Sequence, residues 1–189
     1  MTAPVPRDED DSATLPTGTF SSWMAGMQRA LRGEAASDVP CGTCTACCTA
    51  SQFIHVGPEE TDALAHIPNE LVFPAPGLPD GHVVMGYDEH GCCPMLIDGA
   101  CSIYEHRPRT CRTYDCRIFP ATGLDPGLDD KPLIAAQARR WRFTFPTEAD
   151  REQRAAVQAA VTALRDEAGD VTRLAVAAIE RHQAFLARP

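Results

Sequence analysis

Apolar residues recur at helical spacing near the start of the 189-residue chain, and this pattern predicts a helix over residues 19–36. Either Ser21 or Ser22 can cap this helix. The helix is expected to pack on the domain, with binding to a partner protein as the alternative. Its apolar positions lie three or four residues apart along most of its length: Phe20, Trp23, Met24, Met27 and Leu31.

The middle of the chain predicts only short elements. Residues 59–67 fit a short helix with Pro58 near its start. Residues 82–87 alternate weakly between apolar and polar positions, as a strand does. Glycine, proline and threonine are frequent from residue 40 to residue 120. Because such a region has little core of its own, something other than hydrophobic packing must hold it together.

Three helices are predicted in the last third of the chain. The first covers residues 133–143. The second starts at Thr147, which forms a capping-box-like pattern with Asp150, and runs to about residue 167. Asp170 caps the third, whose apolar stripe consists of Val171, Leu174, Ala175, Ala178, Ile179 and Phe185. These helices carry no evident chemistry, so they are interpreted as a scaffold.

Composition and charge narrow the classes of function. Hydrophobic residues make up 44% of the chain but aromatic residues only 6%, so the core is expected to be mainly aliphatic. The formal net charge of −9 makes a nucleic-acid partner unlikely. No apolar stretch approaches the roughly 20 residues that cross a bilayer, and the N-terminus does not resemble a secretory signal. We therefore expect a cytoplasmic protein with no membrane partner, in which cysteines stay reduced.

All nine cysteines lie between residues 41 and 116. Four of them, Cys41, Cys44, Cys47 and Cys48, form one group in which two-residue gaps let a tight loop point several sulfurs at one ion. The others form a second group, made of Cys92, Cys93, Cys101, Cys111 and Cys116. An Asp98-Gly99 turn between Cys93 and Cys101 is expected to fold these two together. Three cysteines at this spacing together with a Cys-Pro pair are typical of the bacterial ferredoxin run.

Other roles explain nine cysteines less well than metal ligation does. Buried structural cysteines are seldom so dense, a disulfide frame requires export, and a catalytic thiol requires one or two cysteines. Nearby arginines either offset thiolate charge or lie on the surface: Arg107, Arg109, Arg112 and Arg117. Tyr104 and Tyr114 either donate hydrogen bonds to sulfur or simply pack. His90 and His106 are close enough in sequence to bind metal, although a lone histidine beside such a motif is usually not a ligand.

The residues as a whole resemble a known family. The pattern C-x2-C-x2-C-C, followed by Cys-Pro and then C-x-I-Y-x-x-R-P-x-x-C-R-x-Y-x-C, is similar to that of the bacterial YkgJ-type CxxCxxCC cysteine-cluster proteins. That family is described as a zinc- or iron-chelating domain and has flagellin lysine N-methylase as a relative. The resemblance leaves Cys92 outside the pattern. It implies these metal ligands: Cys41, Cys44, Cys47, Cys48, Cys93, Cys101, Cys111 and Cys116.

The expected fold class is mainly α: a small, loop-rich cysteine-cluster metal domain packed against C-terminal helices. Residues 1–18, acidic and proline-containing, are predicted to be a disordered tail. Residues 19–120 would hold the N-terminal helix and the cysteine-cluster region. Residues 121–189 would form the helical scaffold, in one domain with the cluster.

The functional hypothesis is a metal-binding protein that holds an iron–sulfur centre, of the [4Fe–4S] type, or zinc. It would act in redox chemistry, in metal handling or as an accessory to a modifying enzyme, with a protein partner besides the metal. Thiolate ligands suit both metals, and the three-cysteine run with its Cys-Pro favours iron–sulfur. Eight thiolates exceed the four that one zinc ion or one cluster takes, so the sequence does not decide between one metal site and two.

Two alternatives differ in class. One is a lysine methylase-like enzyme, against which the chain shows neither a glycine-rich nucleotide loop nor the radical-SAM cysteine spacing. The other is a structural zinc module that mediates protein–protein interaction. The sequence assigns no catalytic residue, so whether the protein is an enzyme stays open.

Overall fold

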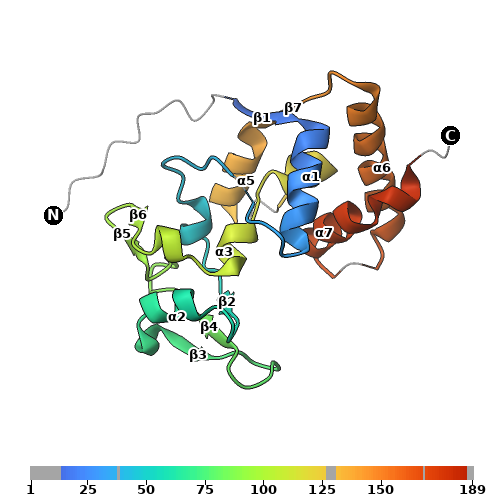
Figure 1. Cartoon of the computed structure of the whole chain (residues 1–189). Coiled ribbons are helices and arrows are strands. Elements are labelled where there is room, and N and C mark those ends of the chain that lie inside the picture. The colour runs from blue at the N-terminus through green and yellow to red at the C-terminus, as the bar shows by residue number, and fades with distance from the viewer. Residues whose placement is uncertain (1–13, 38, 127–130, 168, 187–189) are drawn as a thin grey trace.

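The computed structural model describes residues 14–37, 39–126, 131–167 and 169–186. Helices, short 3-10 helices included, account for 47% of these residues and strands for 13%, so the fold is mainly helical and loop-rich, as expected. A helical part and a smaller part built on a short sheet lie on either side of the cysteine loops (Figure 1). Within the described part of the chain, no helix is long and apolar enough to span a membrane.

Helix α1 (Phe20–Leu31) begins where the sequence predicts but ends five residues earlier. Its cap is Thr19, whose side chain accepts a hydrogen bond from the Ser22 amide at 3.3 Å, so both predicted caps are wrong. The helix stops because Gly33 adopts a positive φ of 76°, a conformation that ends helices readily. Four residues of the predicted apolar face are buried in the core, and the fifth, Leu31, is partly buried against it.

Strand β1 (Leu15–Thr19) pairs in parallel with β7 (Trp141–Thr144). This pair corrects two expectations, a disordered tail as far as residue 18 and a helix as far as residue 143. The apolar residues Leu15 and Phe143 pack against the main core from the two strands, which gives both segments a reason to be ordered. The rest of the expected tail, residues 1–13, lies outside the described residues.

The C-terminal helices are α5 (Pro132–Arg140), α6 (Glu148–Leu164) and α7 (Val171–Arg181), followed by a 3-10 helix at His182–Phe185. The predicted capping box of α6 is confirmed, and so is the Asp170 cap of α7.

Asp150, the acidic member of that capping box, reaches beyond its own helix. Its carboxylate also accepts hydrogen bonds from the amide and the hydroxyl of Ser21, at 2.9 and 2.6 Å. This contact ties the start of α6 to the start of α1. The short helix α4 (Ile118–Thr122) was not predicted, because five residues that include Pro120 show no helical period.

One hydrophobic core joins these helices to the cysteine loops. Ala46 and Cys116 belong to the same buried cluster as residues of α1, α4, α5, α6 and α7. The cysteine region is therefore anchored on the helices. The other buried members are Phe20, Trp23, Met24, Met27, Ile118, Phe119, Ala121, Ile134, Ala138, Trp141, Val157, Ala175 and Ile179.

The smaller part contains an antiparallel sheet of three short strands in the order β2 (Ile54–Val56), β4 (Val83–Met85), β3 (Val72–Pro74). Helix α2 (Thr61–His66) and a 3-10 helix (Asn69–Leu71) lie beside it. The predicted helix and strand of this region are thus confirmed with narrower bounds. A second cluster of buried residues lies here: Val56, Ala63, Ile67, Met85, Met95 and Ile103.

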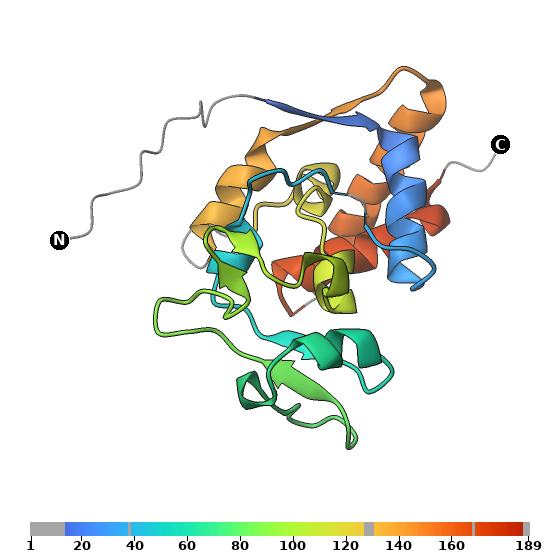
Figure 2. The same cartoon turned by 60° about the vertical axis from the view of Figure 1, so that its left-hand side comes forward.

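Between the two parts lie the hairpin of β5 (Leu96–Ile97) and β6 (Ala100–Cys101), a 3-10 helix (Tyr104–His106) and helix α3 (Arg109–Thr113). Figure 2 shows these loops with the sheet below them and α6 and α7, in orange and red, behind. This middle layer carries Cys101 and Cys111 of the second group of cysteines.

Candidate metal centre

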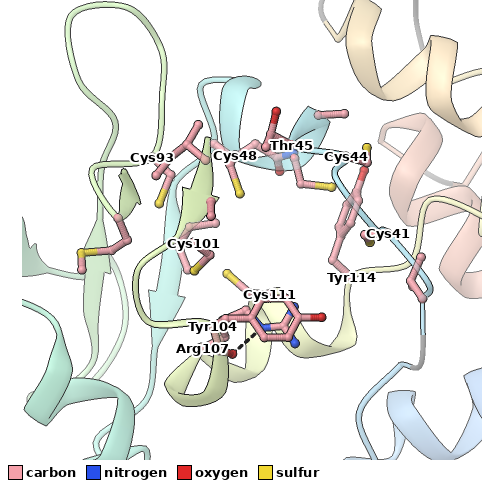
Figure 3. Close-up of a pocket in the computed structure, with 18 of the residues that line it drawn as sticks. Cys41, Cys44, Thr45, Cys48, Cys93, Cys101, Tyr104, Arg107, Cys111 and Tyr114 are labelled. Carbon is pink, nitrogen blue, oxygen red and sulfur yellow. Dashed lines mark hydrogen bonds between the residues drawn. The ribbon is translucent and has the colours of Figure 1, made fainter. Parts of the chain in front are cut away.

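A cavity of about 390 Å³ lies in the middle layer, and cysteines from both sequence groups line it (Figure 3). Every cysteine that the family pattern contains is among its lining residues: Cys41, Cys44, Cys47, Cys48, Cys93, Cys101, Cys111 and Cys116. Cys92 is not. Its amide instead donates to the Asp88 carboxylate at 2.8 Å in a loop outside the cavity. The structure thus brings together all eight predicted ligands.

The first cysteine loop is shaped by a tight turn and a 3-10 helix. The Cys44 amide donates to the Cys41 carbonyl at 2.9 Å, and Gly42 between them has a positive φ of 55°. The 3-10 helix Ala46–Thr49 then carries Cys47 and Cys48. With three residues per turn, consecutive side chains of a 3-10 helix point about 120° apart. The two adjacent cysteines therefore project toward different parts of the cavity.

The β5–β6 hairpin positions two further cysteines. Its register pairs Leu96 with Cys101, and its turn residues Asp98 and Gly99 have φ values of 51° and 77°, as a type I′ turn requires. Cys93, just before the hairpin, donates its amide to the Cys48 carbonyl at 2.6 Å and so connects the hairpin to the first loop. This confirms the predicted turn and brings the two sequence groups into contact.

The last two cysteines lie on or beside short helices. Cys111 is in α3, and Cys116 precedes α4. The indole Nε1 of Trp141 donates a hydrogen bond to the Cys116 sulfur at 3.2 Å. Sequence reasoning placed Trp141 in a scaffold helix, and nothing in the local pattern linked it to a cysteine 25 positions away.

Cys116 also lies between two buried charged residues. Asp115 and Arg117 are 4% and 7% exposed and form an ion pair at 2.8 Å. The Asp115 carboxylate accepts further hydrogen bonds from Trp23 Nε1 at 3.0 Å and Ser37 Oγ at 2.8 Å. Because the charges are paired and hydrogen-bonded, they hold Cys116 in place at the edge of the core. This network joins α1 to the cysteine region.

Burial raises the pKa of several cavity thiols and so favours their protonated form when no cation is bound. Desolvation, reinforced by neighbouring thiols, raises the pKa of Cys48 to about 11 and those of Cys111 and Cys116 to about 12. It raises the pKa of Cys47 even further. A metal ligand must be a thiolate, so a bound cation has to displace these protons. The site therefore favours the binding of metal centres with a strong positive charge.

Residues 40–132 match a family model named CxxCxxCC and described as "Putative zinc- or iron-chelating domain". This segment belongs to the CxxCxxCC family. The predicted family membership is thereby confirmed. A kinship with flagellin lysine N-methylase and a bacterial origin stay predictions. No curated protein and no solved structure matches the chain.

The arginines of the CxxCxxCC domain differ in position. Some lie near thiols, where they can offset thiolate charge, and others lie at the surface. Arg107 and Arg117 lie close enough to lower the pKa of Cys41, although burial still raises it overall. Arg107 also stacks over the Tyr104 ring, 3.5 Å from its centroid. An outer hollow is lined by Arg109 and Arg112, and also by Arg107, together with the acidic side chains Glu59, Glu60 and Asp62. Only the first pair is placed to offset thiolate charge.

The tyrosine Tyr114 is partly buried and lines the cavity of the CxxCxxCC domain. Its pKa is raised, mainly by burial and by the nearby Cys47 and Cys116, and its side chain hydrogen-bonds to that of Gln52. Tyr104 is half exposed at the rim.

The two histidines considered as ligands lie elsewhere. His90 is exposed beside Glu89. His106 stacks on His66 with ring centroids 3.5 Å apart and contacts Asp62 at 2.9 Å. Among the described residues, the cavity lining includes neither a histidine nor a carboxylate. Its metal-binding chemistry is therefore that of thiols alone.

Proposed function

We propose that the chain is an iron–sulfur protein that transfers electrons. In this proposal the cysteines of the cavity in its CxxCxxCC domain bind iron and sulfide as a [4Fe–4S] centre. The donor set supports a soft metal. Mg²⁺ and Ca²⁺ prefer oxygen ligands, whereas thiolates select zinc, Cu(I) and iron–sulfur clusters. A cavity with eight thiols and no carboxylate suits the second group.

The spacing of the sulfurs is the observation that carries the proposal. Zinc–sulfur bonds of about 2.3 Å in a tetrahedron place neighbouring sulfurs about 3.8 Å apart. In the described part of the chain, the one set of three metal-binding side chains whose ligand atoms lie within 4.8 Å of one another is Asp62, His66 and His106, and it contains no cysteine. No three of the cavity thiols among the described residues therefore lie within 4.8 Å of one another, as three ligands of one zinc ion would. A [4Fe–4S] cluster binds each thiolate at a different iron and accepts wider spacing.

The surroundings of the thiols fit a redox role. Apolar side chains such as Ile54, Met85 and Ile134 line the cavity and limit the access of water. Hydrogen bonds to sulfur come from the backbone amides of Met95 and Leu96, which bond to Cys93, and from Trp141. Such donors stabilise the more negative, reduced state of a cluster. The bound cluster would supply one-electron chemistry, and the chain would hold it and tune its potential.

Reversible reduction tests the electron-transfer role. Protein purified without oxygen is expected to show the visible absorption of an iron–sulfur protein, to lose most of it on addition of dithionite and to regain it on mild reoxidation. The reduced form is expected to give an electron paramagnetic resonance signal. Colourless protein that holds zinc and shows no redox response would contradict the proposal and favour the structural zinc module.

A further inference from the structure

The two walls of the cavity belong to different hydrophobic cores. Cys116 is a member of the main helical core, and Cys44 packs against that core. Cys93 and Cys101 instead pack against the second cluster, beside the small sheet. Thiols on opposite walls are therefore held by separate parts of the fold.

The adjacent pair Cys47–Cys48 is divided between these walls. The Cys48 carbonyl accepts the Cys93 amide, which draws Cys48 to the hairpin side, and the 3-10 geometry turns the Cys47 side chain elsewhere. Figure 3 shows Cys48, Cys93, Cys101 and Cys111 gathered around one half of the cavity. Cys41 and Cys44 lie across from them, beside Tyr114 (Figure 3).

Two sets of four follow from this arrangement. The hairpin set is Cys48, Cys93, Cys101 and Cys111. The helical set is Cys41, Cys44, Cys47 and Cys116. Each set draws on both sequence groups, so neither set could be recognised from the order of the cysteines along the chain.

The electrostatic influence of the thiols on one another supports the same division. Among thiols, Cys93 and Cys101 act most strongly on Cys48, ahead of the helical set. All the thiols that act on Cys111 belong to the hairpin set. Cys116 acts most strongly on Cys47, followed by the other members of the helical set and only then by Cys48. Since such influence falls with distance, the sets are spatially separate.

We propose that the cavity holds two metal centres, one bound by the hairpin set and one by the helical set. Four thiolates satisfy either one tetrahedral ion or one [4Fe–4S] cluster, and eight satisfy two. That the centres are clusters rests on the proposed function, but the number of centres does not. Each has its own hydrogen-bond donors, the amides of Met95 and Leu96 for the hairpin set and Trp141 for the helical set. The two centres therefore differ in reduction potential, as a relay needs.

Thiol protection in the full-length, metal-loaded protein tests the number of centres without any variant. Iodoacetamide is expected to modify Cys92 and to leave the other eight cysteines unmodified, as mapped by mass spectrometry. The metal-free protein is the control, because burial alone also slows alkylation. In it, the eight cavity cysteines should react faster than in the metal-loaded protein, whereas Cys92 should react at the same rate in both. Protection of only four cysteines by metal would overturn the proposal.

Paired variants test how the thiols are shared. Cys48→Ser with Cys101→Ser should remove the hairpin centre and about half of the metal. Cys44→Ser with Cys116→Ser should remove the helical centre and the other half, and Cys92→Ser should change nothing. If either folded double variant loses all the metal, the thiols form a single centre and the proposal is wrong.

The two proposals fail in distinguishable ways. Two zinc ions per chain with eight protected thiols and no sulfide would refute the iron–sulfur function and uphold the two centres. One iron–sulfur cluster per chain with four protected thiols would do the opposite.

Discussion

At the scale of single residues, the structure places eight of the nine cysteines in the lining of the cavity and the ninth outside it. Cys111 lines the cavity, whereas Cys92 lies in a neighbouring loop. We expect Cys111→Ser to lose about half of the bound metal, since serine cannot replace a thiolate ligand, and to become more sensitive to protease. The matched control Cys92→Ser should keep its metal content and melting temperature. Metal content of the two purified variants decides this, and an equal loss in both would show that the ligand set is wrong.

Trp141 is expected to act on the proposed centre through a hydrogen bond and not as a ligand. Its indole donates to the Cys116 sulfur at 3.2 Å, and a donor to a thiolate stabilises the reduced state. Trp141→Phe should therefore shift one reduction potential to a more negative value and leave the metal content unchanged. It should also lower the free energy of unfolding by about 1 kcal/mol through the lost hydrogen bond. A redox titration checks the shift, and two unchanged potentials would contradict the role.

Sequence reasoning found the cysteines but not their neighbours. The spacing of the cysteines can be read from the sequence alone, without knowledge of the fold. Trp141 contacts Cys116 because β7 returns to it, and Trp23 contacts Asp115 from α1, and only tertiary structure shows these contacts.

At the scale of elements, the β5–β6 hairpin depends on the backbone freedom of its turn. Gly99 has a φ of 77° and open space around its Cα, so an added methyl group would meet no atom within 4 Å. Gly99→Ala should cost about 1 kcal/mol from backbone strain alone and weaken metal binding by the hairpin set. Urea denaturation of the metal-free and metal-loaded forms measures both effects.

Gly26 is the matched control for that substitution. It also has open space around it, but it lies inside α1 with an ordinary helical backbone. Gly26→Ala should stabilise the protein by about 0.5–1 kcal/mol, because alanine favours helix. If both substitutions stabilise, the turn does not constrain the hairpin.

Elements with local signals were predictable and elements made by distant pairing were not. The Thr147 capping box and the Asp170 cap gave the starts of α6 and α7 directly. Strands β1 and β7 pair across more than 120 positions, and no local pattern indicates such a partner. Trp141 lies three residues after Ala138 and so continues the helical spacing, which is why the end of α5 was placed too late.

At the scale of the whole molecule, the buried thiols make metal-free stability depend on pH. Their folded-state pKa values, about 11 to 12 for Cys48, Cys111 and Cys116, lie above the value of about 8.5 expected in the unfolded chain. Above about pH 8.5 the unfolded state therefore loses protons that the folded state keeps. The free energy of unfolding should fall with rising pH, by up to about 1.4 kcal/mol per pH unit for each thiol.

Denaturation of the reduced, metal-free protein at pH 7.5 and at about pH 9.5 checks this prediction. Bound metal should remove the decline, because the thiols are then already ionised and paired with positive charge. A metal-free protein that is equally stable, or more stable, at the higher pH would show that the thiols are not buried as described.

The sequence predicted a mainly helical, loop-rich protein with a cysteine cluster, because helical periods and cysteine spacing are both visible in a single sequence. The division of the cavity between two hydrophobic cores was not predictable, because it depends on Ala46 and Cys116 reaching the helical core while Cys93 and Cys101 reach the other.

Iron, zinc and acid-labile sulfide, measured per chain on protein purified without oxygen, test the central claim most directly. Two [4Fe–4S] centres predict about eight iron atoms and about eight sulfides in each chain, with little zinc. Zinc bound in place of iron, with no sulfide, would contradict the claim that this domain is an iron–sulfur protein.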